Sequence, residues 1–236
     1  MPSSSTVVYY VSRFIVIGPA LRVFGRPRFQ GLDLVPRTGP VILAANHLAV
    51  VDSFYLIMAA RREVKFLAKS DYFTGTGLKG RLQRWFFTSA GQIPVDRSGG
   101  DAATGSLDAA IELLGSGQAW GIHPEGTRSP DGNMHKGRTG VIRVALATGA
   151  PILPVAITGT EPRPGWRKIL PRRVTVTVLS PFDLSGVDPD DRDSVRAATD
   201  ALMREIAAVT GQKYVDTYAR RWNAEGPGGS EGSPSA

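Results

Sequence analysis

Short apolar runs alternate with helix-like segments along most of the chain. Strands are expected at 26–32, 40–45, 64–68, 91–95, 118–122, 152–158 and 174–179, and the run at 40–45 is typical of a buried strand. Segments expected to be helical lie between or after them, at 54–60, 77–87, 107–114, 139–148 and 194–209. Strands that alternate with helices in this way predict an α/β fold, in which a single central sheet, mixed or mostly parallel, is flanked by helices.

The start of the chain departs from this alternation. Residues 7–24 are the most apolar segment, but Arg13 and Arg22 interrupt it and Gly18-Pro19 is expected to bend it. A membrane-spanning helix needs about 20 largely uncharged residues, and the charged start and cleavage site of a signal peptide are not clear here. We therefore expect residues 1–25 to form a helical segment that lies in one membrane leaflet. A helix packed on the domain's own core is the alternative.

The rest of the chain divides into two parts. Residues 26–222 carry the alternating pattern and are predicted to form one α/β domain. Residues 223–236 are rich in Gly, Ser and Pro and are predicted to be a disordered tail.

Composition and charge limit which binding partners and which kinds of catalysis are possible. The chain has no cysteine, which excludes disulfides, thiolate catalysis and cysteine-based zinc sites. A net charge of +7 predicts attraction to an anion, which nucleic acid, an anionic bilayer and a phosphorylated substrate all provide. Two basic–aromatic clusters suit lipid headgroups as well as single-stranded nucleic acid. The cluster around Trp85 contains Arg61, Arg62, Lys65, Lys69, Lys79, Arg81 and Arg84, and the cluster around Trp166 contains Arg163, Arg167, Lys168, Arg172 and Arg173. Because no nucleic-acid-binding motif is present, we expect an anionic membrane surface and no nucleic acid.

A candidate catalytic pair stands where the run at 40–45 ends. His47 follows that run, and Asp52 comes five residues later, where it is expected to cap the helix at 54–60. Residues five apart on one helix point about 140° apart, so contact between the two side chains requires a turn between them. Imidazole accepts protons near neutral pH, and a carboxylate can orient it and stabilise its charged form. The alternative is a surface histidine before an N-capping aspartate.

Three further blocks follow this pair. They are Gly91-Gln92-Ile93-Pro94-Val95-Asp96-Arg97, His123-Pro124-Glu125-Gly126-Thr127-Arg128-Ser129 and Ala150-Pro151-Ile152-Leu153-Pro154-Val155-Ala156-Ile157. In order and spacing, the four blocks resemble those of the glycerolipid acyltransferase family, whose best-known members are the 1-acylglycerol-3-phosphate acyltransferases. The resemblance covers about residues 30 to 160. His47, Arg97 and Glu125 each follow an expected strand, and sites in such sheets gather at strand carboxyl ends.

The resemblance implies a reaction and a location. A fatty acyl group would pass from acyl-CoA or an acyl carrier protein thioester to the free hydroxyl of lysophosphatidic acid, a monoacylglycerol phosphate, giving phosphatidic acid for phospholipid synthesis. The chain has no G-x-S-x-G sequence and no cysteine, so direct attack without an acyl-enzyme is expected, with no cofactor and no metal. The enzyme would act at the cytoplasmic face of the plasma membrane as a peripheral or monotopic protein.

The resemblance also assigns residues. His47 and Asp52 would be the catalytic pair, Arg97 would bind the acceptor's phosphate, and Glu125 would lie near its glycerol hydroxyls, with a structural Glu–Arg pair as the alternative. Further substrate-binding candidates are Gly126, Thr127, Arg128 and Lys136. His123 stands where the family commonly has Phe, and a passive place on the pocket wall is expected for it, with a second titrating group as the alternative.

Three other functions remain open from the sequence. The acceptor can be another lysophospholipid or a glycolipid. A metal-dependent hydrolase would draw its ligands from His47, Asp52, His123, Glu125 and His135. A non-catalytic lipid-binding protein is the third possibility, although simple lipid binding would not need the His47–Asp52 pair.

Overall fold

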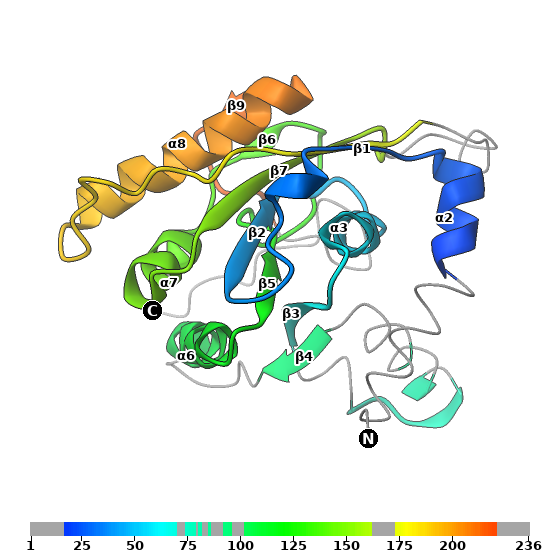
Figure 1. Ribbon diagram of the computed structural model, residues 1–236, viewed down its shortest axis with the longest axis horizontal. Coiled ribbons are helices and arrows are strands. Elements are labelled where there is room, and N and C mark those ends of the chain that lie inside the picture. Colours follow the sequence, from blue (N-terminus) through cyan, green and yellow to red (C-terminus); the bar gives the residue numbers. More distant parts are fainter. Residues whose placement is uncertain are drawn as a thin grey trace, which may run out of the picture.

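The computed structural model describes residues 17–69, 74–78, 80, 81, 85, 92–95, 102–161 and 173–220, and Figure 1 shows its elements. The helices are α2 (Ile17–Gly25), η2 (Leu32–Leu34), α3 (Asp52–Ala60), α6 (Ala102–Gly115), α7 (Gly140–Thr148) and α8 (Arg192–Thr210). The strands are β1 (Arg28–Gln30), β2 (Val41–Ala45), β3 (Val64–Lys69), β4 (Gln92–Val95), β5 (Ala119–Ile122), β6 (Met134–His135), β7 (Ile152–Thr158), β8 (Thr175–Val178) and β9 (Tyr214–Val215).

Seven of these strands form one sheet, in the order β1-β8-β7-β2-β5-β3-β4. Neighbouring strands are parallel throughout, except that β7 and β8 run antiparallel. The sequence-based prediction of an α/β fold with a mixed, mostly parallel sheet flanked by helices is therefore confirmed.

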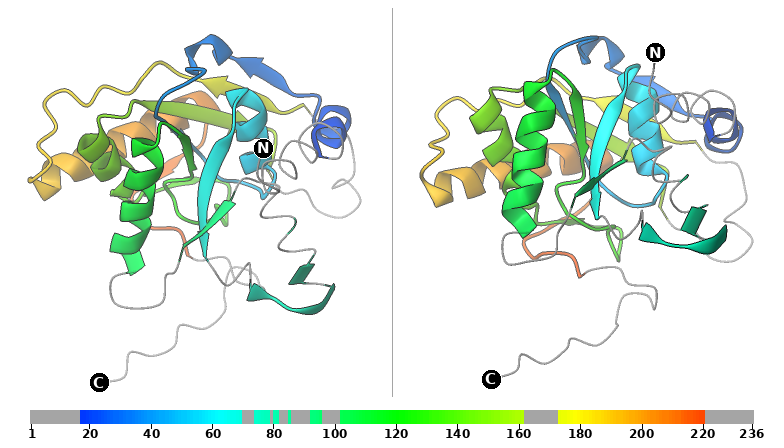
Figure 2. Two further views of the ribbon diagram at one scale, coloured as in Figure 1. Left: turned by 60° about the horizontal axis from the view of Figure 1, so that its bottom comes forward. Right: turned by 90° about the horizontal axis from the view of Figure 1, so that it is seen from below.

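Strand β2 lies at the centre of the sheet, and all five of its residues are buried. Ile42 and Ala44 join the core cluster that contains residues of α6, α7 and α8, whereas Leu43 and Ala45 join the cluster that contains residues of α3. Figure 2 shows α6 and α3 on opposite sides of the strands. A strand covered on both faces reads as a continuous apolar run, which is why the sequence predicted β2 without any alternation.

Several elements differ from their predicted bounds, and one prediction about them was wrong. The first strand covers only residues 28–30, while α6 and α8 are longer than expected. Helix α3 begins at Asp52, and its N-cap is Val51, without a side-chain hydrogen bond. Asp52 therefore does not cap the helix, because its carboxylate turns back to the N–H groups of Leu48 and Ala49 in the preceding loop.

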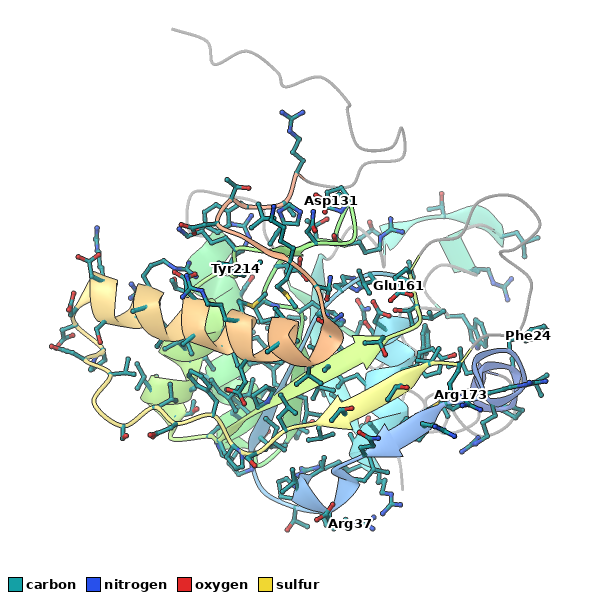
Figure 3. All side chains as sticks on the ribbon, turned by 90° about the horizontal axis from the view of Figure 1, so that it is seen from above. Phe24, Arg37, Asp131, Glu161, Arg173 and Tyr214 are labelled. Atoms are coloured by element: carbon teal, nitrogen blue, oxygen red, sulfur yellow. The ribbon has the colours of Figure 1, made fainter. Side chains whose placement is uncertain are left out.

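Sequence analysis missed a small second sheet, which joins a strand from the middle of the chain to one near its end. Strands β6 and β9 pair in parallel, with Met134 opposite Tyr214. Figure 3 shows Tyr214 beside the loop that carries Asp131. Strands of two residues leave no periodic pattern, so only the fold reveals them.

Helix α2 covers the described part of the apolar N-terminal segment. Gly25 lets the end of α2 approach α3, since a side chain there would collide with Tyr55, whose hydroxyl donates to the carbonyl oxygen of Leu21. The other side of α2 exposes Val23 and Phe24, and Phe24 lies at the edge of the molecule (Figure 3). In the described part of the chain, no helix combines the length and apolar character needed to cross a bilayer.

The predicted basic–aromatic clusters are described only in part. Arg62, from the cluster around Trp85, donates to the carbonyl oxygens of Pro36, Gly39 and Gly117, so its guanidinium holds loops together. Trp166 and the predicted tail at 223–236 lie outside the described residues, as do residues 1–16.

Candidate active site

Asn46 shapes the end of strand β2. Its side-chain amide donates to the carbonyl oxygen of Ile157 at 2.8 Å and accepts from the N–H of Ile157 at 2.8 Å. The same amide nitrogen also donates to Oε1 of Gln212 at 2.9 Å. Backbone pairing between β2 and β7 ends at Ala45, and the fully buried side chain of Asn46 makes the next hydrogen bonds to β7 in its place. His47 follows immediately at the carboxyl end of β2.

His47 and Asp52 meet across the turn that the sequence required. Nδ1 of His47 lies 3.2 Å from Oδ2 of Asp52. The same carboxylate oxygen accepts from the N–H groups of Leu48 at 2.6 Å and Ala49 at 2.7 Å. The His47 side chain keeps 16% exposure, whereas Asp52 is fully buried. The carboxylate therefore orients the imidazole from within, and the ring still reaches solvent.

The charge state of Asp52 follows from these contacts. Burial alone would raise its pKa, but the hydrogen bond to His47 and the charge of that ring act in the opposite direction. The N–H of Ala49 adds to their effect, and the pKa of Asp52 is held below its ordinary value. Asp52 is thus an anion at neutral pH, placed to stabilise positive charge that develops on the neighbouring ring.

The loop from Glu125 to Ser129 holds the backbone of His47 on both sides. The N–H of His47 donates to Oε1 of Glu125 at 3.2 Å, and the N–H of Ser129 donates to the carbonyl oxygen of His47 at 2.7 Å. The second oxygen of Glu125 accepts from the N–H of His135 at 3.1 Å. Burial raises the pKa of Glu125 to about 7. Glu125 thus links the turn at His47 to strand β6, and its predicted contact with the glycerol hydroxyls stays a prediction.

The other predicted substrate-binding residues lie around the same loop or outside the described residues. Gly126 has a φ of +75°, and a side chain there would crowd Nε of Arg138. Thr127 and Arg128 are half-buried in the loop. Lys136 forms an ion pair with Asp216 at 2.7 Å. Arg97 lies outside the described residues.

Sequence reasoning missed several residues that build the site. Asn46 and Gln212 are 166 positions apart in the chain, and only the folded sheet brings them together. Thr160, which is fully buried, follows the last sequence block by three residues and belongs to no motif. Ser53, beside Asp52, donates to His123. Among the described residues, no group of three His, Asp or Glu side chains is placed to hold a metal ion.

This geometry can perform general-base chemistry. Because Asp52 engages Nδ1 of His47, the opposite nitrogen, Nε2, is left to remove a proton from a substrate. The buried carboxylate then stabilises the imidazolium that forms, as in other His–Asp pairs.

Comparisons with known proteins identify relatives of this chain. A family model described as Acyltransferase matches residues 26–158. A 1-acyl-sn-glycerol-3-phosphate acyltransferase of Limnanthes douglasii is 30% identical over 82% of this chain and 68% of its own length. A mouse 1-acyl-sn-glycerol-3-phosphate acyltransferase alpha is 29% identical over 77% of this chain and 65% of its own.

A solved structure shares the fold. The crystal structure of the 1-acyl-sn-glycerophosphate acyltransferase PlsC from Thermotoga maritima superposes with a TM-score of 0.61 at 24% identity, covering 85% of this chain and 78% of that one.

The relatives differ in how much of their own length this chain covers. The chain spans 68% of the Limnanthes douglasii protein but only 38% of a chloroplastic relative from Brassica napus. The match of the family model nevertheless includes both His47 and Asp52 as well as the loop that holds His47. From the family model and the Limnanthes relative together, we conclude that this chain belongs to the acyltransferase family.

Proposed function

We propose that the protein transfers a fatty acyl group from acyl-CoA or an acyl carrier protein thioester to the free hydroxyl of lysophosphatidic acid, giving phosphatidic acid. The observation that carries this proposal is the His47–Asp52 pair, with one partner buried and the other open to solvent, at the carboxyl end of β2. The names of the relatives supply the acceptor class. Another lysophospholipid or a glycolipid is the alternative acceptor.

The reaction needs one base and no covalent intermediate on the protein. The acceptor's hydroxyl oxygen bonds to the thioester carbonyl carbon while its proton passes to Nε2 of His47. Collapse of the tetrahedral intermediate breaks the carbon–sulfur bond, and the imidazolium returns the proton to the leaving thiolate. Asp52 stabilises the imidazolium between these two steps.

Arg97 is our choice for the group that binds the acceptor's phosphate. A guanidinium binds phosphate through two parallel hydrogen bonds, and this arginine closes the second sequence block. Lys136 is a weaker choice because its ammonium is paired with Asp216. Arg128, in the loop that holds His47, is another cation near the site.

Arg97→Ala therefore separates acceptors with and without phosphate. Loss of a charge-assisted contact costs about 1.5–3 kcal/mol, so kcat/KM for the phosphorylated acceptor should fall roughly 10- to 150-fold. Steady-state assays with lysophosphatidic acid and with the matching monoacylglycerol measure the difference. Lys136→Ala is the matched control and should show a smaller phosphate-dependent loss. An equal loss on both acceptors would assign Arg97 a structural role and move the phosphate site to Arg128 or Lys136.

We propose that the enzyme works as a peripheral protein on an anionic membrane surface, at its cytoplasmic face. Helix α2 supports this proposal, because Val23 and Phe24 are 63% and 55% exposed while Arg22 and Arg26 lie exposed beside them. Apolar side chains can enter the acyl boundary while neighbouring arginines stay at headgroup level. A substrate and a product that carry acyl chains would then reach the site from the lipid surface.

Phe24→Glu tests this orientation. The change should weaken sedimentation with anionic vesicles several-fold, because it places a negative charge where an apolar ring would enter the bilayer. Val209→Glu, at a valine of 45% exposure on α8, is the matched control and should bind vesicles like the wild type. Equal losses in both variants would remove α2 from the membrane contact.

A further inference from the structure

His47 is the end of a stack of three rings. The imidazoles of His47 and His123 lie face to face, with ring centroids 3.9 Å apart and planes 9° from parallel. Phe66, on β3, lies behind His123 at 6.0 Å and 21°. Gly121, on β5, leaves room for Phe66, since a side chain there would come within 2.5 Å of the phenyl ring. Two neighbouring strands are thus shaped to support the ring beneath His47.

Hydrogen bonds fix the tautomer of His123. Its Nδ1 lies 3.1 Å from the carbonyl oxygen of Ala45 and 3.0 Å from that of Asn46. Carbonyl oxygens only accept, so Nδ1 carries the hydrogen. Nε2 is then the acceptor in a neutral ring, and the hydroxyl of Ser53 donates to it at 3.0 Å. Both edges of the ring are therefore held by the strand end and by helix α3.

This environment keeps His123 neutral. Burial, together with the charge of His47, lowers the pKa of His123 to about 3. The Asp52 charge and the two carbonyl groups oppose these effects without overcoming them. Of the two roles that the sequence left open for His123, the second titrating group does not fit these contacts.

We propose that His123 is a positioning residue that holds the imidazole of His47, the base. This inference rests on the function proposed above. Its ring, locked by Ala45, Asn46 and Ser53, fixes the plane of the His47 imidazole so that Nδ1 meets Asp52 while Nε2 meets the acceptor's hydroxyl. The ring face also receives the imidazolium formed during the reaction, as aromatic faces attract cations. His123 takes no proton itself.

Kinetics separate a ring platform from a hydrogen-bonding or acid–base role. His123→Phe keeps a flat ring and should keep kcat within about threefold of the wild type, whereas His123→Ala should lower kcat roughly 10- to 100-fold with little change in KM, because misplacement of a catalytic group by about 1 Å has effects of this size. Equal losses in the two variants would overturn the platform role. Activity of His123→Ala within about twofold of the wild type would overturn it as well.

Nuclear magnetic resonance tests the same inference without any substrate. The chain has three histidines, so ¹⁵N-labelled imidazoles give few signals, and His135→Gln assigns one of them. His123 should show the Nδ1-protonated tautomer and no titration from about pH 5 to about pH 8, where an ordinary histidine titrates. The His47 ring protons should shift in His123→Ala and move much less in His123→Phe. Titration of His123 in this range, or unchanged His47 signals in both variants, would overturn the proposal.

A control separates these results from simple destabilisation and from failure of the proposed function. Leu202→Ala removes a fully buried side chain of α8 outside the ring stack, so it should lower stability and leave the His47 signals in place. If the His47 signals moved in Leu202→Ala as they do in His123→Ala, they would report lost stability and the inference would fail. If lysophosphatidic acid is not the acceptor, the ring signals and the tautomer are unaffected, so the two proposals fail separately.

Discussion

Replacing His47 with alanine should lower the rate of acyl transfer by roughly 10²- to 10⁴-fold, the usual contribution of a general base. The variant should still fold, because the contacts that hold this position are made by the backbone. The N–H group donates to Glu125 and the carbonyl oxygen accepts from Ser129, and alanine keeps both groups. The imidazole is the only part that is lost, together with its contacts to Asp52 and His123.

The measurement is kcat with saturating thioester and acceptor, accompanied by thermal unfolding of the same preparation. A melting temperature close to that of the wild type shows that the loss of rate is chemical. Activity within about twofold of the wild type would contradict the role of His47, because a general base typically contributes about 10²- to 10⁴-fold.

Asp52→Asn should reduce kcat by on the order of 10²- to 10⁴-fold while KM changes little. An asparagine can place its oxygen where Oδ2 now accepts from Leu48, Ala49 and His47, so the turn keeps its shape. Its amide nitrogen then takes the place of Oδ1, an atom that is buried and has no hydrogen-bond partner among the described residues. The change therefore removes the negative charge that stabilises the imidazolium and leaves the geometry in place.

The comparison with His47→Ala sharpens this test. If the two residues act as one unit, the double variant should be about as slow as His47→Ala alone, because a carboxylate has nothing to stabilise once the imidazole is gone. Losses that multiply in the double variant would mean that Asp52 acts independently of His47. A rise in KM with unchanged kcat would instead assign Asp52 to substrate binding.

Much of the fold was predictable because its strands are apolar on both faces. Strands β2 and β7 read as continuous apolar runs, and each lies between two covered faces. His47 was predictable for the same reason, since it is the first titratable side chain after such a run. Its contact with Asp52 is local, and a five-residue turn can be argued from the sequence.

The remaining parts of the site depend on contacts between distant segments. The pairing of Asn46 with Ile157 and the bonds from Glu125 to His47 and His135 require the order of strands in the sheet, which no local pattern carries. The error about Asp52 has the same origin. Aspartate before an apolar helix often caps it. Here the carboxylate instead accepts hydrogen bonds from the N–H groups of the preceding loop and from the imidazole.

The small sheet of β6 and β9 has a consequence for the order in which the site is made. Gln212 joins the end of β2 to the next loop, since it accepts from Asn46 and donates to the carbonyl oxygen of Gly132. Thr217 accepts from the N–H of Lys136. During translation, His47, Asp52 and Glu125 are therefore added long before Gln212 and Thr217, which form the hydrogen bonds that hold these loops. A nascent chain that stops short of residue 212 carries His47, Asp52 and Glu125 but lacks the hydrogen bonds of Gln212, so interrupted translation leaves this site incompletely assembled.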